Sequence, residues 1–145
     1  MNAKRHPRQR PASGTVVLAI SCLVALATGC RDAKPRPLIL ADGGGPAVAG
    51  WVDDRVDAFE RERSRDVRVL RVGGAEDALN LATRGDADVA LVPEQAPIDR
   101  FVGGQHGREA GRGPGGARVL VVDARMHPKV DAAGAEELAR SLLEP

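Results

Sequence analysis

Short apolar runs alternate with stretches of helical periodicity along this chain, and that alternation constrains its fold more than any other feature. The runs are rich in Val, Ile and Leu. Val89–Val92 is fully apolar, which is typical of a strand that is covered on both faces, whereas Val67–Val72 shows partial alternation with Arg68 and Arg71. Strands that alternate with helices predict a mostly parallel sheet with helices on both of its faces. We therefore expect a single α/β lobe of three layers. The four runs are Leu38–Ala41, Val67–Val72, Val89–Val92 and Arg118–Val122.

Apolar residues at helical spacing separate the predicted strands. Val48, Val52, Val56 and Phe59 recur every three or four residues with charged residues between them, so that one face of a helix is apolar. Asp131 precedes the last such stretch, and aspartate is one of the residue types that cap helices. The predicted helices are Val48–Arg63, Ala75–Thr83, a short turn over Ile98–Val102 and a C-terminal helix that ends at Leu143.

The segment between the third and fourth runs has a different composition. Gly103–Gly116 contains abundant glycine and shows no apolar periodicity. Glycine leaves the backbone many accessible conformations, which opposes regular structure. We predict a flexible loop here.

The N-terminus has the pattern of an export signal. Four basic residues precede the uncharged apolar run Val16–Ala27, and the small residues Thr28 and Gly29 follow it. A charged start, a short apolar segment and small residues before a cleavage site indicate a signal peptide, and the run is shorter than the roughly 20 residues that span a bilayer. We assign residues 1–29 to the signal peptide and expect an exported protein that faces the periplasm or the cell exterior.

The end of this signal resembles a bacterial lipoprotein box. Ala27-Thr28-Gly29-Cys30 fits the box, in which the cysteine becomes the lipid-carrying N-terminus. The resemblance implies a membrane anchor on Cys30 and an extended tether over residues 30–37, with the lobe over 38–145. Several acyl chains at one site anchor a protein more stably than one chain does. The alternative is an ordinary cleaved signal in which Cys30 is incidental.

Charge and aromatic content argue against a nucleic-acid partner. Residues 1–29 hold four basic residues and no acidic one, so that 17 basic residues stand against 20 acidic ones in the rest of the chain, a net charge of −3. The whole chain has one Trp, two Phe and no Tyr. Proteins that bind nucleic acids present a basic surface, and many stack bases on aromatic side chains. We therefore expect no nucleic-acid partner.

Residues that could support catalysis or metal binding are few. His106 and His127 lack the spacing of zinc ligands, and Ser64 and Ser141 lie in no nucleophile motif. Asp86 and Asp88 could hint at a cation site, but two alternating acidic residues at a strand start are more often solvated or paired with a helix. We predict a protein that is not an enzyme and has no cofactor and no metal.

Glycine-rich turns follow the first two predicted strands. In an α/β sheet, ligands bind beyond the carboxyl ends of the strands, where helix N-termini offer free N–H groups to anions. Glycines let such an anion approach the backbone closely. The sequence thus predicts a candidate oxyanion site formed by Asp42, Gly43, Gly44, Gly45, Gly73, Gly74 and Ala75.

The order of these elements resembles the periplasmic solute-binding proteins of tungstate-type ABC transporters. The stretch Ala78–Val92, which contains Gly85-Asp86-Ala87-Asp88-Val89, carries most of the resemblance, and the likeness covers roughly residues 37–102 and 117–145. It implies a type II periplasmic-binding-protein-like fold and an oxyanion ligand such as tungstate or molybdate. It also implies an ABC permease as a partner.

Two departures from the family affect its implied function. The Gly-rich segment 103–116 stands where the family's chain enters a second lobe, which implies a protein truncated to one lobe. The first glycine turn lacks the hydroxyl groups that the family offers to its ligand, and Asp42, Glu76 and Asp77 add negative charge. We expect weak oxyanion binding or none, with Asp42 and Glu76 as helix caps instead. The alternative function is a lipid-anchored protein-interaction module that has no small-molecule ligand.

Overall fold

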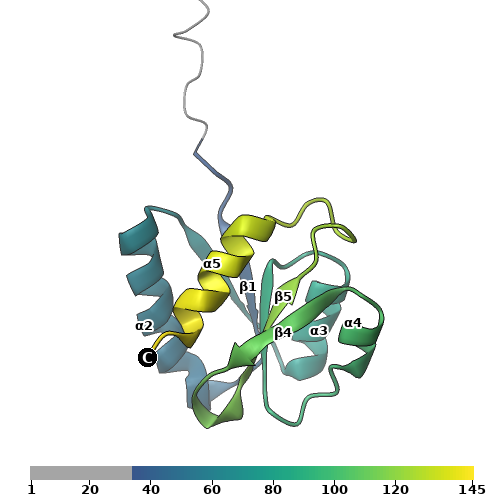
Figure 1. Ribbon diagram of the computed structural model, residues 1–145. Helices are drawn as coiled ribbons and strands as arrows, with labels where there is room; N and C mark the ends of the chain where they lie inside the picture. The colour runs from purple at the N-terminus through teal and green to yellow at the C-terminus, as the bar shows by residue number, and fades with distance from the viewer. Residues whose placement is uncertain (1–33) are drawn as a thin grey trace, which may run out of the picture. The chain divides into compact units, whose positions relative to one another are not determined.

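The structure is a computed structural model that describes residues 34–145. Within it, Pro35–Pro145 form one compact unit. The predicted signal peptide and residues 30–33 of the predicted tether, Cys30 included, lie outside the described residues. Figure 1 labels most of the helices and strands. In chain order they are β1 (Leu38–Asp42), α2 (Pro46–Arg63), β2 (Val67–Arg71), α3 (Ala75–Thr83), β3 (Val89–Val92), α4 (Asp99–Gly103), β4 (Gly107–Arg112), a 3-10 turn (Pro114–Gly116), β5 (Arg118–Val122) and α5 (Ala132–Leu143).

The described strands form one five-stranded sheet in the order β2-β1-β3-β5-β4. Strand β1 runs parallel to both β2 and β3, whereas β5 is antiparallel to β3 and to β4. The carboxyl ends of β1, β2 and β3 therefore lie at one edge of the sheet, which we call the carboxyl edge. The opposite edge, where these three strands begin, is the amino edge.

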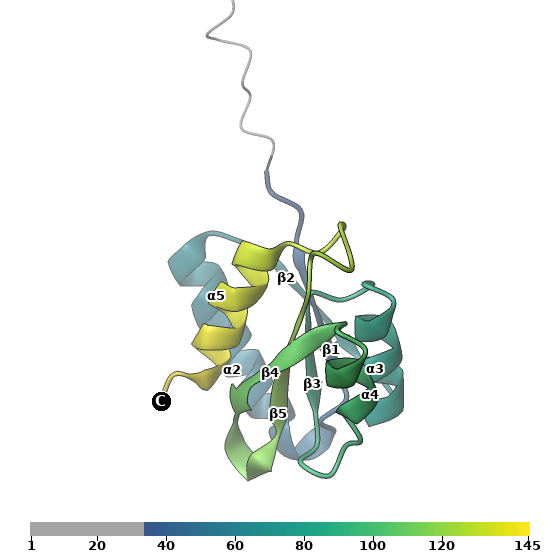
Figure 2. The same ribbon diagram turned by 45° about the vertical axis from the view of Figure 1, so that its right-hand side comes forward.

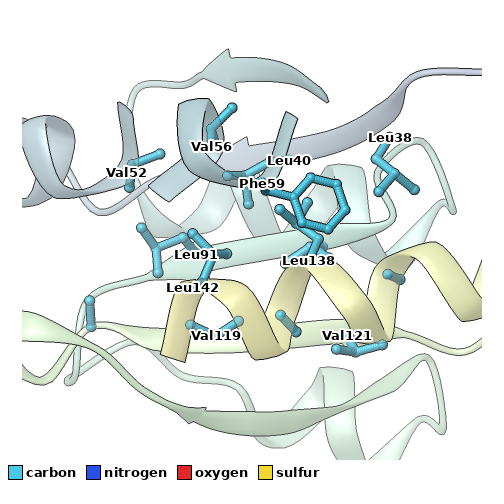
Figure 3. Packing of buried hydrophobic residues seen from close by; sticks show 14 of the residues in the cluster. Leu38, Leu40, Val52, Val56, Phe59, Leu91, Val119, Val121, Leu138 and Leu142 are labelled. Carbon is cyan, nitrogen blue, oxygen red and sulfur yellow. The ribbon is translucent and has the colours of Figure 1, made fainter. Parts of the chain in front are cut away.

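Helices cover both faces of the sheet, which confirms the predicted three-layer α/β lobe. Helices α2 and α5 lie on one face, and α3 and α4 lie on the other (Figures 1 and 2). Each face has its own buried core. Side chains from β1, β3, β5, α2 and α5 meet in the larger core (Figure 3). Full burial of one Leu or Phe side chain contributes about 1.5–3 kcal/mol, so these cores hold the layers together.

Burial on both faces explains why the central strands are continuous apolar runs. Successive side chains of a strand point to opposite faces. Accordingly, Leu38 and Leu40 enter the core under α2 and α5, whereas Ala41 enters the core under α3 and α4. Strands β3 and β5 divide their side chains in the same way.

The predicted flexible loop 103–116 is wrong, because most of it is regular structure. Gly107–Arg112 form β4, which pairs with β5 and carries a register shift between Glu109 and Gly111. Gly115 and Gly116 have φ angles of 65° and 75° in the turn that joins the two strands, a left-handed conformation that favours glycine. Strand β4 lies at the end of the sheet, so it has no apolar pattern that sequence inspection could detect.

The other predicted elements form with small shifts at their ends. Helix α2 begins at Pro46, two residues before the prediction, and proline suits the first turn of a helix because its missing N–H is unpaired there anyway. Strand β2 ends at Arg71 instead of Val72, and α4 covers Asp99–Gly103 instead of Ile98–Val102. The predicted cap of α5 is confirmed, since the Asp131 side chain accepts a hydrogen bond from the N–H of Gly134.

Candidate functional site

The two glycine turns lie against each other at the carboxyl edge. A Cβ atom at Gly43 would lie 2.6 Å from the carbonyl oxygen of Gly74 and 2.9 Å from Cβ of Ala78. The N–H of Gly43 donates to the carbonyl oxygen of Leu91, at 2.8 Å, which ties the first turn to β3. The structure therefore brings together the two groups of residues that the sequence predicts as one site.

Each remaining glycine of the predicted site has a definite place at this edge. Gly45, with a φ angle of 76°, is the residue that precedes α2, and Gly74 precedes α3, of which Ala75 is the first residue. A Cβ atom at Gly44 would lie 3.3 Å from the Asp42 carboxylate, and one at Gly73 would lie 3.0 Å from the Asp77 carboxylate. Both turns are thus approached by acidic side chains.

Asp42 lies at the centre of this edge and is almost fully buried. Its Oδ1 accepts a hydrogen bond from the N–H of Gly44, at 3.0 Å. Its Oδ2 lies 3.8 Å from Nε of Arg71. The prediction that Asp42 and Glu76 cap helices is wrong, because neither α2 nor α3 has a side-chain cap hydrogen bond. Glu76 instead lies in the first turn of α3, where a negative charge interacts favourably with the helix dipole.

Arg71 is a charged partner that sequence inspection missed. It is the last residue of β2 and is directly opposite Asp42 in the parallel register. Its guanidinium also forms an ion pair with Asp53 of α2. The register of the two strands could have indicated this pair, because both residues end apolar runs. Arg71 offsets only part of the acidic charge around the turns, which comes from Asp42, Asp53, Glu76 and Asp77.

A second charged group fixes the loop after β3 to the β4–β5 hairpin. Arg118 donates to Glu109 at 2.8 Å and to the carbonyl oxygen of Ala96 at 3.3 Å. These interactions lower the pKa of Glu109, mainly through the hydrogen bond from Arg118. Arg112 joins both Glu109 and Glu94. The loop after β3, which also lies at the carboxyl edge, is thus held by the ion pair between Glu94 and Arg112 to β4, a strand that sequence analysis did not predict.

Of the two expectations for Asp88, solvation is wrong because the residue is buried at the amino edge, whereas pairing with a helix agrees with its hydrogen bond from the N–H of Asp131, the N-cap of α5. Only 1% of the residue is exposed. Its carboxylate accepts two hydrogen bonds from Arg36, at 2.9 and 2.5 Å, and one each from the N–H groups of Ile39 and Asp131. Asp86, by contrast, is exposed and pairs with Arg84. The Asp88 carboxylate therefore serves to hold the chain where it enters β1.

Two histidines also meet, although they are 21 positions apart in the sequence. Nδ1 of His106 and Nε2 of His127 are 3.2 Å apart, so that one nitrogen donates a hydrogen bond and the other accepts it. Among residues 34–145, no three His, Cys, Asp or Glu side chains are grouped so that they could hold a metal ion. In the same part of the chain, no helix has both the length and the apolar character to cross a bilayer.

Comparisons with known proteins give one similarity over part of the chain. A chain in the crystal structure of the tungstate ABC transporter from Geobacter sulfurreducens is 28% identical to this one, with a TM-score of 0.44. The similarity covers 50% of this chain and 31% of that chain. No protein-family model and no curated protein matches the sequence.

Proposed function

We propose that this protein is an exported, lipid-anchored relative of the solute-binding proteins of oxyanion transporters, and that it is not an enzyme. Its candidate ligand site is the pair of glycine turns at the carboxyl edge, which we propose binds an oxyanion weakly or not at all. The single observation that carries the proposal of weak or absent oxyanion binding is the hydrogen bond from the N–H of Gly44 to the buried Asp42 carboxylate. One backbone donor that an oxyanion could use is already bound to a negative group of the protein itself.

Electrostatics supports weak binding. Two like charges about 4 Å apart repel by about 4 kcal/mol at the effective dielectric constant near a protein surface. A bound dianion would meet this repulsion from Asp42 and would find Arg71 already paired with Asp42 and Asp53. The glycine turns provide close access to the backbone, but the charges around them oppose the ligand.

Calorimetry with tungstate, molybdate, sulfate and phosphate tests this proposal. We expect no micromolar binding to the wild-type protein. The Asp42→Asn variant keeps an oxygen that can accept from Gly44 while it removes the negative charge, and we expect it to bind an oxyanion at least about tenfold more tightly. Glu137→Gln on α5 is the matched control, because it makes the same change in charge at a residue outside this edge. Micromolar binding by the wild type, or equal gains in both variants, would contradict the proposal.

The lipid anchor on Cys30 is a separate part of the proposal, since it depends on the N-terminal residues. Labelling with a fatty acid in a bacterial host, followed by mass analysis of the purified protein, tests it. We expect lipid on the wild type and on Cys22→Ala, but none on Cys30→Ala. A wild-type protein that is cleaved without lipid would show that the signal is an ordinary one.

An ABC permease is the proposed partner, and cross-linking in intact membranes tests it. Recovery of a permease and its ATPase would support a role in transport. Repeated recovery of a different protein without them would favour the alternative function, a lipid-anchored interaction module.

A further inference from the structure

A hollow on the face that carries α3 and α4 has a volume of 720 Å³. Pockets of roughly 300–1,000 Å³ are the usual size of small-molecule sites. The hollow is distinct from the glycine turns, although Glu76 in its lining follows Ala75 directly in the chain. Helices α3 and α4 lie side by side in both views (Figures 1 and 2). The lining of the hollow consists of Glu76, Leu79, Asn80, Thr83, Pro97, Asp99, Arg100, Phe101 and His106.

Five polar side chains of this lining have no hydrogen bond or ion pair within residues 34–145. In two other hollows on the lobe, some of the charged side chains are engaged with each other, namely Arg108 with Glu136 and Asp123 with Arg125 in one, and Arg36 with Asp88 in the other. The five side chains are Glu76, Asn80, Thr83, Asp99 and Arg100, of which Asp99 also interacts electrostatically with Arg118.

The lining also contains apolar side chains and the imidazole ring of His106. Leu79 is half-buried against the core of this face, and Pro97 is also part of the lining. The rings of Phe101 and His106 are stacked with their centroids 6.4 Å apart. The hydrogen bond between His106 and His127 holds the His106 ring in place. Small-molecule sites typically have this composition, in which a few convergent polar groups interrupt an apolar lining.

We propose that this hollow binds a small zwitterion that carries an apolar side chain, which is either a free amino acid or a peptide of two or three residues. The ammonium group pairs with the carboxylates of Glu76 and Asp99. The carboxylate pairs with Arg100, whose planar guanidinium can donate two parallel hydrogen bonds to it. Asn80 and Thr83 offer donors and acceptors to a peptide bond, and Leu79 contacts the apolar side chain. This site is independent of the proposed oxyanion function.

Calorimetry on the full-length chain, with leucine, leucyl-leucine and trileucine as probes, tests the site and distinguishes the two sources of the zwitterion. N-acetyl-leucine lacks the ammonium group and leucine amide lacks the carboxylate. A hydrogen bond to a charged group contributes about 1.5–3 kcal/mol, so that loss of either charge should weaken binding at least about tenfold. Equal binding of leucine and N-acetyl-leucine would overturn the assignment, as would the absence of binding by all three zwitterions.

Variants of the lining residues provide the second test. Arg100→Gln and Glu76→Gln remove charges from exposed side chains that make no hydrogen bond or ion pair in the lobe. We expect the melting temperature to stay unchanged in Arg100→Gln and to fall slightly in Glu76→Gln, which also loses its interaction with the dipole of α3. We expect each variant to bind the zwitterion at least about tenfold more weakly. Arg68→Gln, an exposed arginine on β2 that is not in the lining, is the matched control and should bind as the wild type does. Unchanged affinity in Arg100→Gln would show that the hollow is not the binding site.

Discussion

Asp88, which is almost fully buried, forms an ion pair with the partly exposed Arg36, and the two residues are 52 positions apart in the sequence. Arg36 also donates to the carbonyl oxygen of Lys129, at 2.7 Å. The pKa of Arg36 is raised, mainly by its hydrogen bond to Asp88. One guanidinium thereby connects the start of β1, the strand β3 and the turn before α5. A buried charge pair is favourable only while both partners are present.

Arg36→Ala should therefore be strongly destabilising. It leaves the Asp88 carboxylate buried with only two backbone donors, and we expect the free energy of unfolding to fall by about 3 kcal/mol. Urea denaturation measures this change. Arg140→Ala, which removes an exposed arginine from α5, should change the free energy by less than about 0.5 kcal/mol. Similar losses in the two variants would mean that the Arg36–Asp88 pair contributes nothing to stability.

Asp131 provides a second residue-scale prediction, which concerns pH. The pKa of its carboxyl lies below the ordinary value of 3.8, first because it accepts from the N–H of Gly134 and then because Arg65 donates to it. An acid with a lowered pKa in the folded state adds stability above its unfolded pKa and loses it as the pH falls through the folded value. The stabilisation by Asp131 is therefore present at pH 7 and declines below about pH 4.

Asp131→Asn separates the charge of this residue from its capping role. Asparagine caps a helix about as well as aspartate, so the variant loses mainly the interaction with Arg65. We expect a loss of about 1 kcal/mol at pH 7 and a smaller loss at pH 3, measured by urea denaturation. Asp54→Asn on α2 is the control for charge alone. A deficit that stays constant from pH 7 to pH 3 would exclude a role for the ionised carboxylate.

Two helical glycines differ in their surroundings at the scale of whole elements. Gly134 lies in the first turn of α5, where a Cβ atom would collide with Nη1 of Arg65 and lie 2.7 Å from Cδ2 of Leu38. Gly50 lies in α2, where a Cβ atom would have no neighbour within 4 Å. Gly134 therefore allows α5 to pack closely on β1 and Arg65, whereas Gly50 has no such role.

Replacement of these two glycines by alanine should have opposite effects on the free energy of unfolding. Gly50→Ala should raise the free energy of unfolding by up to about 1 kcal/mol, because alanine favours the helix. Gly134→Ala should lower it by about 1–3 kcal/mol, because the close packing must open. Thermal or urea denaturation of the pair measures both changes. Stabilisation by both substitutions would show that α5 does not pack as closely on Arg65 and Leu38 as the structure indicates.

The β4–β5 hairpin joins the lobe as a whole, since it contacts helices on both faces. A Cβ atom at Gly107 would lie 2.5 Å from Cζ of Phe101 in α4, and one at Gly113 would lie 2.7 Å from Cζ2 of Trp51 in α2. Both faces therefore depend on a segment with a loop-like composition. Because the two cores share one sheet, we expect the lobe to unfold as a single cooperative unit.

Gly113→Ala tests the packing of the hairpin, and Trp51 is the natural probe because the chain has one Trp. The substitution should shift the Trp51 fluorescence and lower the free energy of unfolding by about 1–3 kcal/mol. Gly103→Ala, a position with open space around the Cβ atom, is the control and should leave the fluorescence unchanged. Equal spectra for both variants would indicate that the segment is a loop free of α2.

Much of the fold was predictable because four of the five strands of the sheet are apolar runs and the longer helices carry apolar faces. The order of the elements, the carboxyl edge with its glycine turns and the Asp131 cap all follow from such local patterns. Strand β4 was not predictable, because an edge strand that reads Gly-Arg-Glu-Ala-Gly-Arg is stabilised by pairing with β5 and not by its own residues.

Apart from β4, local sequence determined where this chain forms strands, helices and turns, since backbone preference and side-chain burial act over a few residues. Only the tertiary structure decided which polar groups meet. Asp42 with Arg71 and Asp88 with Arg36 are joined by strand pairing and chain entry across long separations. Five polar side chains from α3 and α4 line one hollow for the same reason. Side-chain partners depend on distances in space, which periodicity along a chain does not specify.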